Sequence, residues 1–137
     1  MDRQVPVYSM VRSPGPSDSA RPVLAAMIGV RRRPAAVITR VLGGLGDNAV
    51  VFSLHRAMPI EDLRIAHKEV GEHLAGGDSV LVNGATSTKR DRRTLWDIAS
   101  RHRAATLAVI RPADPDHTAA LVAEIASEGW HAVVVAP

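Results

Sequence analysis

Cysteine is absent from this chain of 137 residues. The chain therefore has no disulfide framework and no thiolate metal site, and its default compartment is intracellular, the cytoplasm of a bacterial host cell. Aromatic residues are also scarce, with two tryptophans, one tyrosine and one phenylalanine. This scarcity disfavours a single-strand-binding surface built on base stacking.

Long apolar runs are missing as well. No run reaches the roughly 18 residues of a membrane-spanning helix, and residues 1–20 carry prolines and polar groups in place of a signal-peptide core. The histidines show no HExxH or comparable ligand spacing. We therefore expect no secretion, no membrane contact and no bound metal.

The composition is that of one soluble globular domain with a real core, because 46% of the residues are hydrophobic and 23% are charged. The net charge is only +3, but the basic residues are fifteen arginines and two lysines. Arginine suits contact with phosphates and carboxylates. The same bias favours a GC-rich bacterial or bacteriophage genome.

The chain divides into an arm and a domain. The stretch RSPGPSDSARP mixes proline, glycine and serine with almost nothing to bury. We expect residues 1–21 to form an extended arm without regular structure of its own, and residues 22–137 to form the folded domain.

Five short apolar runs recur in that domain. They are RPVLAAMI, NAVVFS, DSVLVN, ATLAVI and HAVVVAP. Each is rich in valine, isoleucine and leucine without polar alternation, as expected of strands covered on both faces. Helix-like stretches separate them at 34–42, 59–75, 88–103 and 116–128. The alternation predicts an α/β fold with a three-layer, parallel, five-stranded sheet and right-handed crossovers.

Local signals mark several helix ends. Thr88 followed by Asp91 predicts an N-cap with a capping acidic residue, and Gly76 with Gly77 predicts the end of the second helix. The stretch GGLGDN, residues 43–48, predicts a helix stop and a turn, with a phosphate-binding loop as the alternative. Pro34 suits the first position of a helix.

Ligands of parallel sheets bind outside the carboxyl ends of the strands. The residues that follow the apolar runs are dominated by arginine, which predicts an anion- or partner-binding edge; a solvated charged face is the alternative. Arg92 belongs to the same basic stretch. The candidate residues are Gly29, Arg31, Arg32, Arg33, Arg56, Lys89, Arg90, Arg93 and Arg111.

Four stretches carry a resemblance to a known family. They are MIGVRRRPAA, VVFSLHRAM, GGDSVLVNGATSTKRDRR and EGWHAVVVAP. Their order and spacing resemble the P-loop kinase domain of polynucleotide kinases and related AAA-type small kinases, over residues 23–137. The third stretch is the most specific, because its glycine, valines, Thr88, Lys89, Asp91 and the following arginines fall in register. The resemblance implies a P-loop NTPase-like fold.

The departures from the family pattern affect the residues that bind phosphate and magnesium in the family. A P-loop follows G-x-x-x-x-G-K-[ST], in which lysine reaches the phosphates and the hydroxyl holds magnesium. Gly29 matches, but Pro34, Ala35 and Ala36 occupy the second glycine, lysine and hydroxyl positions. Pro34 has no N–H to offer a phosphate.

Two acidic positions of the family are also replaced. His55 stands where the second-strand segment has its aspartate base, and Asn83 where the third strand ends in aspartate. The lid is missing too, because Arg111 leads through PADPDH almost directly into the last helix. Phosphoryl transfer depends on positioning and electrostatic stabilisation by such groups. The resemblance therefore implies a pseudoenzyme without a catalytic residue.

Three functions remain open from the sequence. The first is a non-catalytic binding or regulatory protein that engages an acidic protein surface or nucleic acid through the basic edge and needs no cofactor. The second is a residual polynucleotide or nucleotide kinase, or an NTPase, that uses ATP and magnesium with His55 as an atypical base. The third is a structural or assembly subunit, in which the arm docks on a neighbour in an oligomer.

Overall fold

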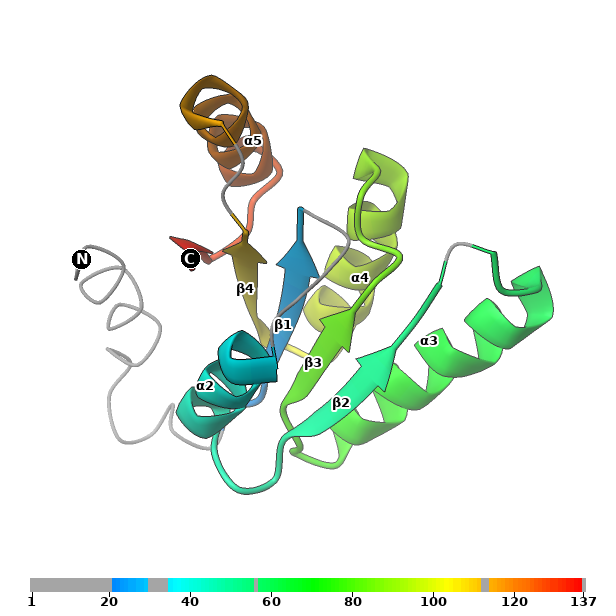
Figure 1. The fold of residues 1–137 in the computed structure, drawn as a ribbon. Helices are drawn as coiled ribbons and strands as arrows, with labels where there is room; N and C mark the ends of the chain where they lie inside the picture. Colours follow the sequence, from blue (N-terminus) through cyan, green and yellow to red (C-terminus); the bar gives the residue numbers. More distant parts are fainter. Residues whose placement is uncertain (1–20, 30–34, 56, 112–113, 137) are drawn as a thin grey trace.

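A computed structural model describes residues 21–29, 35–55, 57–111 and 114–136. Figure 1 shows the arrangement of their helices and strands. The strands are β1 (Val23–Ile28), β2 (Val50–Ser53), β3 (Val80–Asn83), β4 (Ala105–Ile110) and β5 (Ala132–Val135), and the helices are α2 (Ala35–Leu45), α3 (Ile60–Ala75), α4 (Lys89–Arg101) and α5 (Pro115–Ser127). All five apolar runs contain a strand, as predicted. None of the described helices is long and apolar enough to cross a membrane.

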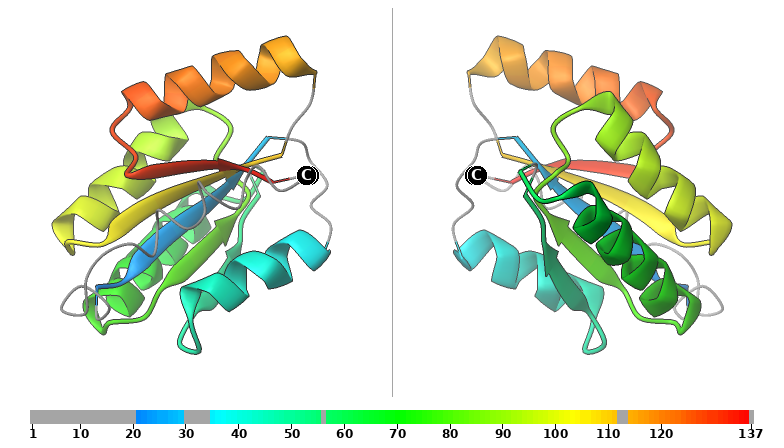
Figure 2. Two further views of the ribbon diagram at one scale, coloured as in Figure 1. Left: turned by 90° about the vertical axis from the view of Figure 1, so that its left-hand side faces the viewer. Right: turned by 90° about the vertical axis from the view of Figure 1, so that its right-hand side faces the viewer.

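The five strands form one parallel sheet in the order β2-β3-β1-β4-β5. The connection from β1 to β2 crosses the sheet in one direction, and the later connections cross it in the other. With right-handed crossovers, such a reversal places the first helix on the opposite face from the rest. Figure 2 shows this arrangement, with α2 on one side of the sheet and α4 and α5 on the other. The predicted α/β fold with a five-stranded parallel sheet is confirmed.

Two apolar cores cover the two faces. On the face of α2, Val37 and Val41 pack with Met27, Leu107 and Val109. The other core joins α3, α4 and α5 to the sheet and includes Trp130. The central strands β1 and β4 are buried almost throughout, which explains their uninterrupted apolar sequences.

Strand β2 departs from the prediction that both strand faces are covered. Its residues alternate between half-buried and exposed, and Val51 is 40% exposed. The strand lies at the edge of the sheet beside β3 alone. Phe52 packs against the core on the α3 side, whereas its neighbours Val51 and Ser53 are exposed. An apolar run in the sequence does not show which strand lies at the edge of the sheet.

Helix α2 is longer than predicted. It continues through Gly43 and Gly44 and ends at Leu45, three residues beyond the predicted limit of residue 42. The helix stop and the turn predicted within residues 43–48 are confirmed, because Gly46 has φ +102° and a turn follows at residues 47–48. Each glycine weakens a helix by about 1 kcal/mol relative to alanine. The added turn is compensated by packing, because Leu42 and Leu45 both contact the core on this face.

The other helix ends follow local signals. The Thr88 side chain accepts a hydrogen bond from the Asp91 N–H at 3.0 Å, which confirms the predicted N-cap. Gly76 caps the end of α3, as predicted. Helix α5 starts slightly earlier than expected, because Asp114 caps it by accepting from the His117 N–H at 2.8 Å. Pro34 and residues 1–20 of the arm lie outside the described residues.

Candidate functional site

The carboxyl ends of the strands lie side by side. Ser53 of β2 is level with Asn83 of β3, which is level in turn with Met27 of β1. The backbone pairing continues one residue further, where the Leu54 N–H donates to the Asn83 carbonyl oxygen at 2.9 Å. His55 follows directly and is exposed. Asn83 therefore ends β3, the second strand of the sheet, and His55 lies two residues beyond the end of the neighbouring β2.

The loop after β3 is held tightly against both neighbours. Gly84 has φ +110°, and a Cβ there would lie 1.9 Å from the Leu54 carbonyl oxygen, so only glycine fits. Ala85 follows with φ 53°, which is unusual for a residue with a side chain. The buried Thr86 hydroxyl donates to the Met27 carbonyl oxygen at 2.6 Å. None of the motifs considered in the sequence marks this loop, although an Asn-Gly pair after an apolar run signals a backbone turn.

The structure brings two predicted site residues together, Gly29 after β1 and Arg111 after β4. The Arg111 N–H donates to the Ile28 carbonyl oxygen at 3.0 Å. Gly29 has φ +116°, and a Cβ there would lie 3.0 Å from the Arg111 carbonyl oxygen. The Arg111 Nε is buried and has no hydrogen-bond partner among the described residues. A buried donor without an acceptor is unusual in proteins, and it makes Arg111 the strongest candidate for holding an anion at this edge.

Arg92 corrects the prediction that the whole basic stretch after β3 faces a partner. Its side chain is 1% exposed and binds two carboxylates of α5 and its end, at 2.6 Å to Glu124 and 2.7 Å to Glu128. Its Nη1 also donates to the Ser87 carbonyl oxygen at 3.1 Å. The hydrogen bond with Glu128 raises the pKa of Arg92, against the opposing effect of burial. Arg92 therefore joins α4 to the end of α5, because a buried guanidinium needs such partners.

The remaining basic residues of this stretch lie on the first turns of α4 and are exposed. Lys89, Arg90 and Arg93 line a groove of about 560 Å³ together with Trp96 and Trp130. Arg93 is already engaged, because its Nε donates to Asp97 at 3.1 Å and its guanidinium lies 5.9 Å from the centre of a Trp96 ring.

The groove brings together part of the predicted cluster. Neither Gly29 nor Arg111 is among the described residues that line it. Arg31, Arg32, Arg33 and Arg56 lie outside the described residues. The convergence of all these arginines on one edge therefore stays a prediction.

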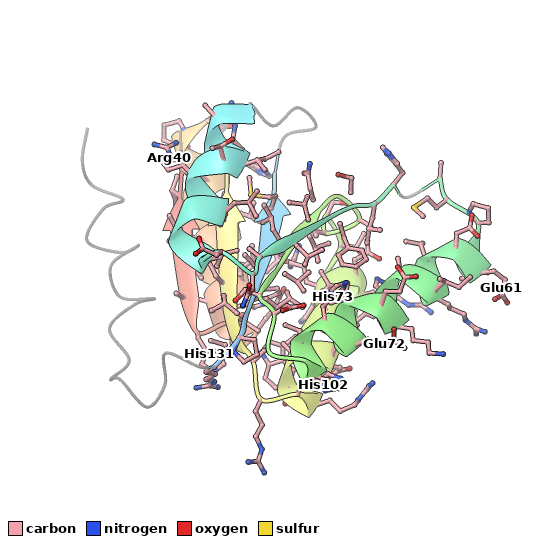
Figure 3. All side chains as sticks on the ribbon, turned by 90° about the horizontal axis from the view of Figure 1, so that it is seen from below. Arg40, Glu61, Glu72, His73, His102 and His131 are labelled. Atoms are coloured by element: carbon pink, nitrogen blue, oxygen red, sulfur yellow. The ribbon has the colours of Figure 1, made fainter. Side chains whose placement is uncertain are left out.

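The histidines near α3 and the amino ends of the strands have structural contacts. The His73 Nδ1 lies 3.0 Å from an Asp78 carboxylate oxygen, and its ring meets Phe52 edge-on with 5.7 Å between ring centres. Figure 3 shows His73 at this end of the molecule, with His102 nearby. Burial lowers the pKa of His67, and Asp91 opposes this effect. These contacts tie helix ends to the sheet.

Comparison with known proteins adds no identification. No protein-family model matches the chain, and no curated protein matches it significantly.

Proposed function

We propose that the chain is a catalytically inactive, P-loop-kinase-like binding or regulatory protein that holds an acidic group of its partner at the carboxyl ends of the strands. The observation that carries the proposal is the pair of Gly29 and Arg111. In this pair, the buried Arg111 Nε has no acceptor among the described residues and belongs to the residue that follows β4, directly beside the end of β1.

We propose that catalysis is lost because of the residues that stand at the positions of the kinase's catalytic groups. Ala35 and Ala36 open α2, where a kinase needs its lysine and hydroxyl. Asn83 ends β3 with a neutral amide, and His55 is exposed beyond β2. None of these four side chains supplies the negative charge that helps to hold Mg²⁺. The Arg111 guanidinium at the same edge can bind an anion. Binding without phosphoryl transfer is therefore the function we favour.

The partner is expected to be an acidic protein surface or nucleic acid. Arg111 provides a charged donor, and Arg31, Arg32, Arg33 and Arg56 follow β1 and β2 in the sequence and remain predicted members of the same edge. Nucleic acid binding would fall steeply with salt, with a slope set by the number of phosphates neutralised. A mainly apolar protein interface would respond less.

The experiment compares Arg111→Met with Arg64→Met. Both variants remove one arginine charge and keep much of the side chain, but Arg64 is a highly exposed residue of α3 that pairs only loosely with Glu61 at 3.9 Å. Binding of single-stranded DNA and of a polyglutamate peptide is measured for both variants at several salt concentrations. Loss of binding in Arg111→Met alone supports the proposal. Equal binding by the two variants contradicts it.

A further inference from the structure

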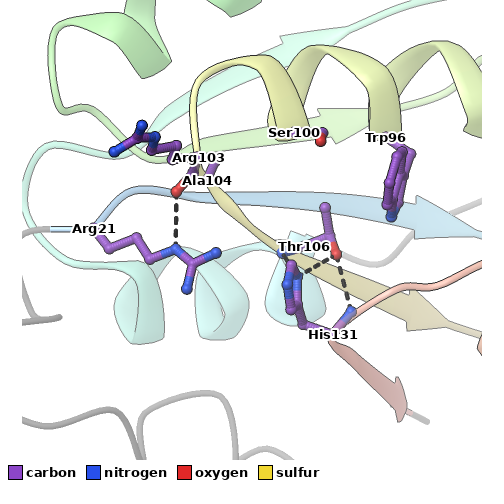
Figure 4. A pocket seen from close by; sticks show the side chains of 7 residues that line it. All are labelled: Arg21, Trp96, Ser100, Arg103, Ala104, Thr106 and His131. Atoms are coloured by element: carbon purple, nitrogen blue, oxygen red, sulfur yellow. Dashed lines mark hydrogen bonds between the residues drawn. The ribbon is translucent and has the colours of Figure 1, made fainter.

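A second cavity lies at the opposite end of the sheet from the candidate site. It has a volume of about 500 Å³ and is shown in Figure 4. Cavities of this size hold small organic ligands in other proteins. The wall comes from the end of α4, the start of β4 and the residues just before β1 and β5. Its lining includes Arg21, Trp96, Ser100, Arg103, Thr106 and His131.

Two arginines reach this cavity from chain segments that are far apart in sequence. The Arg21 Nε donates to the Arg103 carbonyl oxygen at 2.8 Å, across 82 residues of sequence. This bond uses one of the five N–H donors of Arg21 and fixes the side chain over the cavity. Figure 4 shows the Arg21 guanidinium on the side of the His131 ring.

The His131 ring is held in one orientation by Thr106. Its Nδ1 accepts from the Thr106 backbone N–H at 3.0 Å and lies 2.8 Å from the Thr106 hydroxyl. That hydroxyl in turn accepts from the His131 backbone N–H at 2.9 Å. Because Nδ1 serves as an acceptor, the proton of the neutral ring is on Nε2, which leaves a second donor at the cavity.

Arg103 occupies a backbone conformation that glycine would adopt more easily. It follows the end of α4 with φ 57°, at the position where helices commonly end in glycine. Its neighbour completes the helix end, since the Ala104 N–H donates to the Ala99 carbonyl oxygen at 2.8 Å. An arginine at this position keeps a cation at the rim of the cavity in spite of the backbone strain, with its exposed guanidinium pointing away from the His131 ring in Figure 4.

The cavity has arginines but no carboxylate to neutralise their positive charge, since none of the described residues that line it is acidic. The carboxylate closest in sequence to His131 is Glu128, which binds Arg92. Burial, together with the positive charge of Arg21, lowers the pKa of His131. Trp96 and the buried Ala104 supply an apolar wall beside these donors.

We propose that this cavity binds a small phosphate monoester, with its phosphate between Arg21 and His131, the exposed Arg103 at the rim, and its organic part against Trp96. The donors come from three segments and include the Arg21 guanidinium, an imidazole N–H and the Ser100 hydroxyl, with the Arg103 guanidinium at the rim. A phosphate offers three strong acceptor oxygens, which match such a set better than the two oxygens of a carboxylate. The site shares no residue with the Gly29–Arg111 edge and does not depend on the function proposed for that edge.

The test is calorimetric titration of the full chain with adenosine monophosphate, adenosine and succinate. We expect adenosine monophosphate to bind, and adenosine and succinate to bind at least about tenfold more weakly, as loss of a charged hydrogen-bonded group predicts. Trp96 fluorescence should change on binding. Equal or tighter binding of succinate, or no binding of adenosine monophosphate, would overturn the proposal.

The variants separate binding from folding. Arg103→Gly removes the cation and relieves the strained backbone, so its melting temperature should rise while its affinity for adenosine monophosphate falls at least about tenfold. Arg21→Met should also lose affinity. Arg101→Ala, an exposed arginine of the same helix end that does not line the cavity, is the control. Unchanged affinity in Arg103→Gly and Arg21→Met would contradict the site. Arg111→Met should leave this affinity unchanged, so the two proposals fail separately.

Discussion

Gly29 and Arg111 lie against each other where β1 and β4 end, and a Cβ on Gly29 would lie 3.0 Å from the Arg111 carbonyl oxygen. The contact joins the residue that follows β1 to the arginine that follows β4. The backbone of Gly29 also adopts φ +116°, which side chains disfavour. A side chain at this position is therefore disfavoured for two independent reasons.

Gly29→Ala should destabilise the fold by about 1–3 kcal/mol, because it adds both strain and a close backbone contact. The matched control is Gly43→Ala inside α2, where a Cβ would meet nothing within 4 Å. That control should stabilise the protein by up to about 1 kcal/mol. Urea unfolding measures both variants. A Gly29→Ala protein as stable as the parent would show that the ends of β1 and β4 are not packed in this way.

Arg92→Met should destabilise the protein strongly, by about 3–5 kcal/mol, because it leaves the largely buried Glu128 carboxylate without its charged partner. The control is Arg93→Met, whose exposed pairing with Asp97 is worth less than about 1 kcal/mol. Thermal unfolding followed by circular dichroism compares the two. Similar melting temperatures would contradict the assignment of Arg92 as the link between α4 and α5.

Stability should fall when the pH drops from 7.5 to 5.5. Burial lowers the pKa of both His67 and His131 below the ordinary value of 6.5. The unfolded chain therefore binds more protons than the folded chain in this range, and the stabilisation present above pH 6.5 is lost as the pH falls toward the lowered pKa values. Denaturant unfolding at both pH values measures the loss. The double variant His67→Gln, His131→Asn should lose less stability over the same interval; an equal loss would assign the effect to other groups.

The features that could be predicted from the sequence are those that depend on residues close together in the chain. The Thr88 cap is formed by a hydrogen bond to a residue three positions later, and the five apolar runs locate the strands regardless of their order. The extra turn of α2 could not be predicted this way. It depends on the sheet beneath Leu45, which no local rule describes.

The site was predicted only in part, for the same reason. Arg92 resembles its basic neighbours in sequence, but its partners lie 32 and 36 residues away on another helix. The exposed face of β2 follows from the strand order, which the pattern of apolar runs leaves open. The cavity beside Arg21 was not predicted, because its residues come from four separate segments and form no motif.

Titration of the full chain with ATP, in the presence and absence of magnesium, measures whether the protein retains kinase chemistry. With Ala35 and Ala36 in the first turn of α2 and Asn83 at the end of β3, we predict that magnesium does not tighten ATP binding and that no γ-phosphate reaches water or a polynucleotide. Tight magnesium-dependent binding with measurable γ-phosphate transfer would contradict the account.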